Sequence, residues 1–409
     1  MLKILINAYA CSPNMGSEPG MAWNWCVHLA KHCELYIITE GEFRDRIDAA
    51  LPDLPQGSNM HFYYNPVLPK VRQMCWNQGD WRFYWHYRQW QKKTLQIAKE
   101  IVEKYPIDIV HQLNMIGFRE PGYLWRMTDI PFVWGPIDAK GDFPIAYLDG
   151  AGFKDKLFIH LKNYVNKLQI RYSKRVKSAI QNTSLAISAS SNSQHTLKEY
   201  YHIDSLLLNE SGCNIREESS PNARLLHRDF MEIIWVGKLD FRKQLRLALR
   251  ILSQTKNKNI RLHIVGGGNA EEYKKLIFAL NIEEQCVWHG VLNHNAVQEK
   301  MQQSDLLLFT SVAEGTPHVV LEAIANELPV LCFDTCGQGD CVDDKVGYKI
   351  SLSNPEQSIQ EFADALNYLF IHRDRLKEMS AHCRKRQIEL SWERKAETMA
   401  SLYEKVVAE

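Results

Sequence analysis

The stretch that decides the fold is residues 305–325, which read Asp-Leu-Leu-Leu-Phe-Thr-Ser-Val-Ala-Glu-Gly-Thr-Pro-His-Val-Val-Leu-Glu-Ala-Ile-Ala. The run from Asp305 to Phe309 is short, apolar and β-prone, as a buried parallel strand is, and Leu321 to Ala325 reads as helix. A loop lies between them. If the helix begins at His318, its N–H groups and dipole can hold an anion there.

Two carboxylates, Glu314 and Glu322, straddle this loop-to-helix junction. Ionised carboxylates accept hydrogen bonds from hydroxyl groups, so the pair suits the hydroxyls of a sugar and of a nucleotide ribose. A second interpretation is that both are solvated acids at a helix start, where acidic side chains are favoured. The pair alone leaves both interpretations open.

The composition is that of an enzyme-sized globular chain. Its 409 residues, 45% of them hydrophobic, suffice for two or more packed domains, and the net charge of +1 argues against nucleic acid as a partner. The ten cysteines are scattered without C-x2-C pairs, so we expect reduced thiols in a cytoplasmic protein. The start is too briefly apolar for a signal peptide, and no run approaches the ~18 apolar residues that span a bilayer.

Short apolar runs alternate with longer amphipathic ones, which predicts βα units around parallel sheets, twice over. The predicted strands of the first half are Lys3 to Asn7, Leu35 to Thr39, Asp108 to His111, Pro131 to Trp134 and Ser184 to Ala189. Those of the second half are Glu232 to Val236, Arg261 to Val265, Cys286 to Trp288, Asp305 to Phe309, Val330 to Phe333 and Gly347 to Ile350.

We therefore predict an α/β protein with two Rossmann-like domains, at residues 1–208 and 230–390. Residues 209–229 are polar with little periodicity, which indicates a linker. The last segment, 391–409, contains an amphipathic helix from Trp392 to Val407.

Two Rossmann-like halves raise the possibility of a dinucleotide enzyme, which the glycines exclude. Gly266-Gly267-Gly268 follows a predicted strand, but Glu271 stands where the G-x-G-x-x-G fingerprint needs its third glycine. The turn after the first strand contains Gly16 and Gly20. These two either bring the backbone close to a diphosphate or are plain turn residues.

A cationic turn follows the strand that ends at Val236. It reads Gly237-Lys-Leu-Asp-Phe-Arg-Lys243, with a helix predicted from about Gln244. Ligands of doubly wound sheets bind at the carboxyl ends of strands, so Lys238 and Lys243 could neutralise a departing diphosphate. The alternative is a solvated basic turn.

The ordered motifs resemble the retaining GT-B glycosyltransferases of family 4, the group 1 glycosyltransferases. They are a glycine loop after the first strand, Val-Gly-Lys-Leu-x-x-x-Lys, Val-Gly-Gly-Gly, His-Gly-Val-Leu, Glu-x7-Glu-Ala and Ser391-Trp-Glu. The likeness is strong over the second half. It implies two Rossmann-like domains facing across a cleft, and a C-terminal helix that crosses back to the first domain.

The resemblance also implies roles for the candidate residues. Lys238 and Lys243, with Gly237, would hold the diphosphate of the donor, Glu314 would bind a hydroxyl of its sugar, and Glu322 would bind its ribose. The remaining donor-site residues it implies are Gly16 near the β-phosphate, Val291 and Leu292 at the base, and Gly315, Thr316, Pro317, His318 and Val319 at the sugar and phosphates.

The implied reaction uses a nucleotide-sugar co-substrate, a UDP- or GDP-sugar, with no cofactor and no metal. Positive charge develops on the sugar ring and negative charge on the diphosphate, so fixed cations at the phosphates lower the barrier. Three positions depart from the family. Lys238 stands where arginine is commonest, Gln244 replaces a glycine, and Asp138 follows the strand where many members have a histidine.

Two catalytic candidates lie in the first half. Asp138 is the polar residue nearest to the place of the missing histidine. His111 ends a strand expected to face the cleft, where it would contact acceptor or donor, or would be a structurally satisfied histidine.

A membrane surface is a further expected partner. Residues 151–178 predict a basic amphipathic helix, and Trp76, Trp81, Trp85 and Trp90 lie among arginines and lysines. The alternative is that the apolar face packs on the sheet. The first interpretation predicts a peripheral position at the inner face of the cytoplasmic membrane.

The sequence thus favours a transferase that moves a sugar to a saccharide or lipid-linked acceptor with retention, in the synthesis of bacterial surface polysaccharide. A GT-B-fold epimerase or phosphorylase is one alternative, and a non-catalytic nucleotide-sugar-binding subunit is another. The donor, acceptor and linkage are left open.

Overall fold

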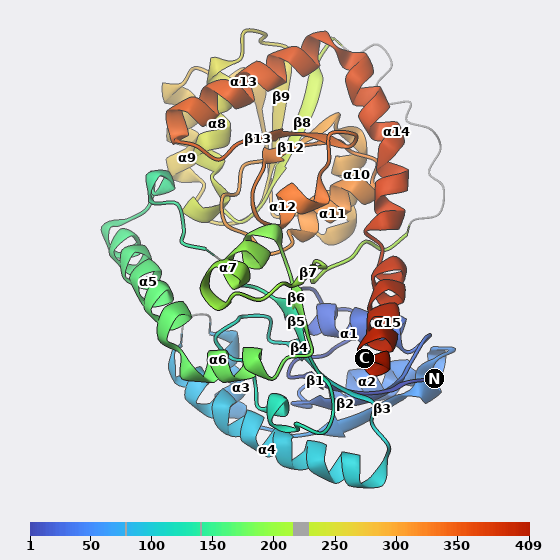
Figure 1. Cartoon of the computed structure of the whole chain (residues 1–409). Coiled ribbons are helices and arrows are strands. Elements are labelled where there is room, and N and C mark those ends of the chain that lie inside the picture. Colours follow the sequence, from blue (N-terminus) through green and yellow to red (C-terminus); the bar gives the residue numbers. More distant parts are fainter. Residues whose placement is uncertain (78–79, 140, 216–228) are drawn as a thin grey trace. The chain divides into compact units, whose positions relative to one another are not determined.

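The computed structural model describes residues 1–77, 80–139, 141–215 and 229–409. These divide into two compact units, each a parallel sheet with helices on both faces (Figure 1). Unit 1 comprises Met1–Gly141, Lys167–Ser211 and Trp392–Glu409, and unit 2 comprises Asp142–Asn166 and Gly212–Ser391. Most of the predicted linker, at residues 216–228, lies outside the described residues.

The sheet of unit 1 has seven strands in the order β3-β2-β1-β4-β5-β6-β7. They are β1 (Lys3–Ala8), β2 (Glu34–Thr39), β3 (Met60–Tyr64), β4 (Ile109–Asn114), β5 (Phe132–Ile137), β6 (Leu185–Ser188) and β7 (Leu206–Leu207). The helices of unit 1 are α1 (Ser17–Leu29), α2 (Arg44–Ala50), α3 (Pro69–Trp76), α4 (Arg82–Lys104), α6 (Lys174–Gln181), α7 (Ser191–Tyr201) and, at the C-terminus, α15 (Trp392–Ala408), while α5 (Phe153–Tyr172) is divided between the two units.

The sheet of unit 2 has six strands in the order β10-β9-β8-β11-β12-β13. They are β8 (Met231–Val236), β9 (Ile260–Val265), β10 (Cys286–Gly290), β11 (Leu306–Phe309), β12 (Val330–Phe333) and β13 (Gly347–Ile350). Its helices are α8 (Leu245–Gln254), α9 (Glu271–Ala279), α10 (His294–Gln303), α11 (His318–Ala325), α12 (Cys336–Cys341), α13 (Pro355–Ile371) and α14 (Arg373–Glu389).

Each sheet is buried on both faces, which explains its near-continuous apolar strands. In unit 2, Ile233 and Trp235 of β8 pack with α8 and α13, whereas their neighbour Ile234 packs with α10 and α11. Successive residues of a strand point to opposite faces, so one short strand supplies both cores. The fold class predicted from the sequence is confirmed.

Every predicted strand is present within a few residues of its predicted ends, but two strands were not predicted. β3 is mostly half-buried and β7 is an exposed pair, and both lie at edges of the sheet of unit 1. Edge strands bury less surface, so they lack the continuous apolar run by which the central strands were recognised.

The C-terminal helix belongs to unit 1, as predicted. The ring of Trp392 lies 5.9 Å from that of Trp25 in α1, at an edge-to-face angle. The buried Lys395 donates a hydrogen bond from Nζ to the carbonyl of Asn209 at 3.1 Å. These contacts tie the end of the chain to the first sheet.

The single helix predicted over residues 151–178 was wrong, because the structure breaks it at Ser173. The hydroxyl of Ser173 accepts a hydrogen bond from the N–H of Val176 and so caps α6. Serine favours a cap because its side chain satisfies an N–H group that the new helix leaves unbonded. Residues 153–172 and 174–181 therefore form two separate helices, α5 and α6.

Candidate functional site

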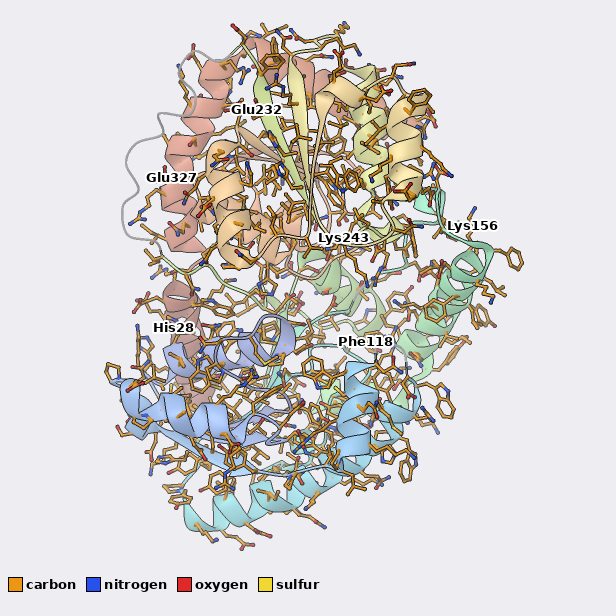
Figure 2. The ribbon with its side chains drawn as sticks, turned by 180° about the vertical axis from the view of Figure 1, so that it is seen from behind. His28, Phe118, Lys156, Glu232, Lys243 and Glu327 are labelled. Carbon is orange, nitrogen blue, oxygen red and sulfur yellow. The ribbon has the colours of Figure 1, made fainter. Side chains whose placement is uncertain are left out.

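The order of strands in unit 2 creates a switch point between β8 and β11. From this pair, the chain order continues with β9 and β10 on one side and with β12 and β13 on the other. In sheets of this type, ligands bind beyond the carboxyl ends of the strands at the switch point. Figure 2 shows Glu232, near the start of β8, at one end of the sheet and Lys243 at the other. The turn after β8 and the loop after β11 therefore meet at the binding edge.

Lys243 and Glu314 form an ion pair at this edge. Their Nζ and Oε1 atoms lie 2.5 Å apart, and 27% and 18% of the two side chains is exposed. The ammonium also lies 5.9 Å from the ring centre of Phe309, at the end of β11. Lys238 in the same turn is exposed, and among the described residues its ammonium forms no ion pair. The structure thus brings Lys243 and Glu314 together.

The turn that holds Lys243 depends on Gln244 and Thr310. Gln244 has φ of 57°, a left-handed conformation that glycine adopts more easily, which is consistent with the glycine that the resemblance implies at this position. Its amide Nε2 donates hydrogen bonds to the carbonyls of Tyr147 and Phe241, each at 2.6 Å. These bonds offset the backbone strain.

Thr310 was missed by the sequence reasoning. Its hydroxyl lies within 3.1 Å of the carbonyls of Lys243 and Gln244, and it accepts from the indole N–H of Trp235 at 3.1 Å. It therefore fastens the turn after β8 to the end of β11. A threonine at the end of an apolar strand is too common to signal this from sequence.

The glycines that failed the dinucleotide test hold the neighbouring turns together. A Cβ atom on Gly266 would lie 1.7 Å from the carbonyl oxygen of Gly237, so the two turns approach more closely than any side chain allows. Gly266 also donates its N–H to the carbonyl of Gly290 at 2.8 Å. These contacts place the exposed Val291, and Leu292 after it, at the same edge.

The loop after β11 leads directly into α11. Pro317 precedes the helix without a side-chain cap, Thr316 is buried, and His318, the first helical residue, is exposed. The carbonyl of Gly315 accepts the N–H of Gly337 at 3.1 Å, so the start of α12 supports this loop. Only a glycine fits there, because a Cβ on Gly337 would meet that oxygen at 2.3 Å.

Glu322 lies one turn into α11, and Val319 is half-buried near its start. Oε1 of Glu322 is 3.8 Å from Nδ1 of His294, the first residue of α10. The helix start, Glu322 and the pair of Lys243 and Glu314 are thus all supplied by segments around β8, β10 and β11. Their contacts with a ligand stay predictions.

Gly16 and Asp138 lie in unit 1. Gly16 is exposed and precedes α1, with an extended backbone and no side-chain cap for the helix. Asp138 follows β5, donates its N–H to the carbonyl of Ile116 at 2.8 Å and accepts the N–H of Phe118. Both are at the carboxyl edge of their sheet, and their roles toward donor and acceptor stay predictions.

His111 is wholly buried in β4, with both ring nitrogens engaged. Nε2 lies 2.6 Å from the carbonyl of Gly135, so it carries the proton, and Nδ1 lies 2.6 Å from the hydroxyl of Tyr403 and accepts from it. Burial lowers the pKa of His111 to about 4, which keeps the ring neutral. This geometry is that of a structurally satisfied histidine, the second of the two expectations.

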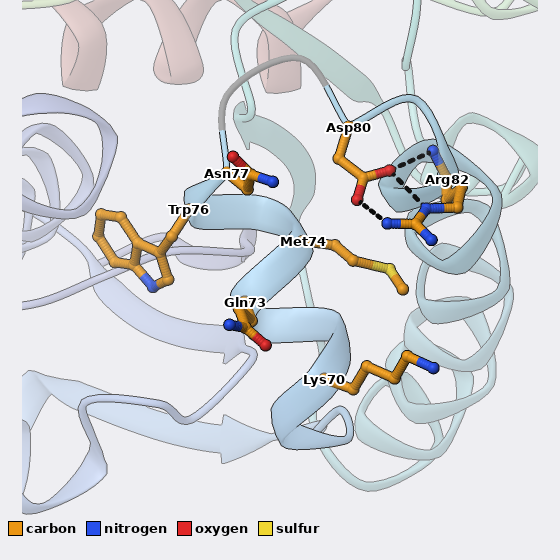
Figure 3. Close-up of a pocket in the computed structure, with 7 residues that line it drawn as sticks. All are labelled: Lys70, Gln73, Met74, Trp76, Asn77, Asp80 and Arg82. Carbon is orange, nitrogen blue, oxygen red and sulfur yellow. Dashed lines mark hydrogen bonds and ion pairs between the residues drawn. The ribbon is translucent and has the colours of Figure 1, made fainter.

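Unit 1 contains a cavity of about 620 Å³ between α3 and the start of α4 (Figure 3). Its lining includes Lys70, Met74 and Trp76 from α3, and the ion pair of Asp80 with Arg82. The guanidinium holds the pKa of the Asp80 carboxyl below its usual value. Polar groups beside an indole ring form a surface that suits sugars.

Helix α5 has a large apolar face exposed. The exposed fraction is 82% for Phe153 and 61% for both Leu157 and Tyr164, while Ile159 and Ile170 on the opposite side are buried. The predicted packing of the apolar face on the sheet is therefore not what the structure has. Of the four tryptophans grouped with this surface, Trp90 is buried, and the other three are exposed.

Among the described residues, no group of three or more histidine, cysteine, aspartate or glutamate side chains is arranged to hold a metal ion. In the same part of the chain, no helix combines the length and the apolar character that crossing a membrane requires.

The comparisons with known proteins agree with this geometry. Residues 217–386 match the family model described as glycosyl transferases group 1. The lipopolysaccharide 1,6-galactosyltransferase of Escherichia coli (strain K12) is 35% identical over 114 residues, which cover 27% of this chain and 30% of that protein. Protein CapJ of Staphylococcus aureus is 24% identical over 214 residues, which cover 49% of this chain and 51% of CapJ. The chain thus spans about a third to a half of these relatives.

Solved structures match the whole chain. The lipopolysaccharide outer core galactosyltransferase WaaB has a TM-score of 0.63 at 17% identity, and the match covers 98% of this chain and 100% of the WaaB chain. The Anabaena protein HepE, solved in complex with UDP and glucose, has a TM-score of 0.58 at 14% identity and covers 99% and 100%. Identities this low show the fold alone. The chain therefore has the GT-B fold, and its residues 217–386 are similar to the group 1 glycosyl transferases.

Proposed function

We propose that this chain transfers a sugar from a nucleotide-sugar donor to a saccharide or lipid-linked acceptor with retention of configuration. The observation that carries the proposal is the ion pair of Lys243 with Glu314 at the switch point of unit 2. It puts a cation for phosphate and a carboxylate for a hydroxyl at adjacent strand ends. The UDP and glucose held by HepE support a nucleotide-sugar donor, a UDP- or GDP-sugar.

The same residues supply the chemistry. As the acceptor oxygen bonds to the anomeric carbon, the bond from that carbon to the diphosphate oxygen breaks, and its electron pair leaves on the diphosphate. The acceptor proton passes to the diphosphate on the same face of the sugar. Lys243, with Lys238, stabilises the charge that develops on the leaving group, while Glu314 and Glu322 orient the sugar and the ribose. No protein nucleophile, metal or cofactor is proposed.

A thermal-shift panel of UDP-, GDP- and ADP-sugars tests the donor site, since a ligand that binds only the native state raises its melting temperature. We expect one nucleotide to stabilise the protein and Glu322→Ala to abolish that shift. Glu271→Ala, which removes an exposed carboxylate of α9, is the matched control. A panel without any shift, or a shift that Glu322→Ala leaves intact, contradicts the assignment.

Product analysis with the stabilising donor separates the remaining functions. A transferase releases the nucleoside diphosphate only with an acceptor, whereas an epimerase changes the donor sugar without one. A non-catalytic subunit binds the donor and turns over nothing. Lipid-linked oligosaccharides from bacterial surface polysaccharide are the first acceptors to try, because the Escherichia coli relative is named for lipopolysaccharide.

We also propose that the chain works in the cytoplasm at the inner face of the membrane, with α5 on an anionic surface. The exposed apolar face of this helix is flanked by exposed Lys156 and Arg171 on one side and Lys162 on the other. Apolar groups enter the interface while cations bind lipid headgroups. Vesicles with phosphatidylglycerol should retain the protein in flotation at low salt, and vesicles of phosphatidylcholine alone should retain less.

The double variant Leu157→Glu/Leu161→Glu should reduce retention on the anionic vesicles. Phe278→Glu is the matched control, because Phe278 is an apolar residue of α9, outside the helix tested, and is 73% exposed. Equal retention of all three proteins would refute this attachment and leave the transfer function untouched.

A further inference from the structure

A second charged cluster lies in unit 1, outside the residues discussed so far as donor site. It consists of Arg88 from α4, Arg119 from the loop after β4, and Arg175 from α6, around the buried carboxylate of Glu120. Nε and Nη2 of Arg88 donate to Oε1 of Glu120 at 3.2 and 3.0 Å, and Nη2 of Arg175 donates to Oε2. Both oxygens of the carboxylate are thus used by two guanidinium groups.

Arg119 is the third cation of the cluster, and the two ion pairs of Glu120 are made by Arg88 and Arg175. Its guanidinium lies 5.1 Å from the ring centre of Phe118, and its carbonyl accepts Nη2 of Arg175 at 2.8 Å. Among the described residues its side chain donates no hydrogen bond and forms no ion pair. Arg119 is therefore positioned by its contact with the Phe118 ring and by its own carbonyl, while the N–H groups of its guanidinium donate no hydrogen bond within the described part of the chain.

The surroundings of Arg119 make this arrangement costly. Burial lowers the pKa of its guanidinium, against the opposing effects of Tyr84, Asp138 and Glu120. Nη1 of Arg175 is also buried without a hydrogen-bond partner in the described part of the chain. A half-buried cation without a paired anion loses solvation and gains little in return. Guanidinium donors therefore exceed acceptors in this cluster.

The cluster occupies the place where ligands bind in such sheets. β1 and β4 form the switch point of unit 1, and a bridge between Gly117 and Asp138 prolongs the pairing of β4 and β5 beyond their ends. Arg119 lies two residues after Gly117. The planar fork of arginine matches the two oxygens of a phosphate or carboxylate, which lysine cannot do.

We propose that Arg119, supported by Arg88 and Arg175, binds an oxyanion of the acceptor, a phosphate or a carboxylate group. The identification of the ligand as the acceptor rests on the proposed transfer function, whereas the anion site rests on the cluster alone. Acceptors of this kind are glycan chains with an acidic sugar or with a phosphate at the end that carries the lipid.

Calorimetric titration tests the site, with inorganic pyrophosphate, glucuronate and glucose as probes. All proteins carry Lys243→Ala, which weakens anion binding at the donor site. On this background, Arg119→Gln should weaken binding of the anionic probe about tenfold or more, because a charge-assisted, two-pronged contact is lost. Arg119→Lys should weaken it less. Pyrophosphate alone points to a phosphate, and glucuronate alone to a carboxylate.

Arg126→Gln is the matched control, because Arg126 is an exposed arginine of unit 1 whose guanidinium lies over the rings of Tyr123 and Trp125. It should leave the affinity unchanged. The proposal is overturned if neither anion binds, if glucose binds equally well, or if Arg119→Gln and Arg126→Gln have equal effects. Should Arg119→Gln fail to fold, the comparison of Arg119→Lys with Arg126→Lys decides in the same way.

These titrations use neither a nucleotide sugar nor turnover. Pyrophosphate binding that depends on Arg119, together with no response to any nucleotide sugar, would refute the transfer function and leave the anion site standing. A donor-dependent melting shift with no effect of Arg119→Gln on either anion would do the opposite.

Discussion

The switch points of the two units differ in how their charges are matched. In unit 2 one ammonium, Lys243, meets one carboxylate, Glu314, and both side chains remain partly exposed. In unit 1 three guanidinium groups surround one carboxylate, Glu120, of which only 6% is exposed. The same sheet topology thus presents a balanced pair at one edge and an excess of positive charge at the other. When a ligand enters unit 2, Lys243 and Glu314 can each exchange their contact for one with the ligand. In unit 1 the excess positive charge is compensated only when an anion binds.

The largest effect is expected for Lys243→Ala, which removes the cation of the balanced pair. Once a donor is identified, the rate of the chemical step should fall about 100-fold or more, because charge on the departing diphosphate loses its fixed partner. Single-turnover kinetics measure that step apart from acceptor binding, which should change little. Lys238→Ala, at an exposed position, should have a smaller effect, and an unchanged rate in Lys243→Ala would remove the role.

Neutralising the carboxylate in each unit compares the two edges directly. Glu120→Gln should cost about 3 kcal/mol of unfolding free energy, since it removes the buried carboxylate that Arg88 and Arg175 share. Glu314→Gln should cost about 1 kcal/mol, because solvent reaches Lys243. Urea unfolding followed by tryptophan fluorescence measures both, with Glu271→Gln as an exposed control. Equal costs would show that the charge excess in unit 1 has no energetic consequence.

Acid should weaken unit 1 through His111. Its pKa is about 4 in the folded chain and near 6.5 when unfolded, so the unfolded state binds the proton first. Stability is therefore full above pH 6.5 and falls as the pH drops from about 6.5 to about 4, by roughly 3 kcal/mol at most. Urea unfolding between pH 7 and pH 5 measures the slope. His111→Gln should flatten it, and an equal slope in both proteins would contradict the assignment.

A further, small effect concerns the turn that presents Lys243. Gln244→Ala keeps the left-handed backbone but loses two side-chain hydrogen bonds, so it should cost about 1 to 2 kcal/mol. Gln244→Gly loses the same bonds but relieves about 1 kcal/mol of strain, and should be the more stable of the two. Thermal unfolding checks the order, and a less stable glycine variant would show that the turn is not strained.

The central strands could be predicted because each buries both faces and so reads as an apolar run, as in Leu306–Phe309. The edge strand Met60–Tyr64 could not, because it is mostly half-buried and so lacks a continuous buried apolar run. In the site, Lys243 and Glu314 were found by their charge and their position after strands. Thr310 was not, because a hydroxyl shows its role only through the carbonyls it contacts.

The sequence by itself determined the α/β class, the two sheets and the charged residues at the carboxyl edge of the second sheet, since these follow from local periodicity and from side-chain chemistry at strand ends. Only the tertiary structure decided which charges are paired. Glu120 and Arg175 lie far apart in the chain, and so do Lys243 and Glu314, so their contacts depend on the packing of helices on the sheets. The same packing buries His111 against the hydroxyl of Tyr403 and leaves Arg119 half-buried without an ion pair among the described residues.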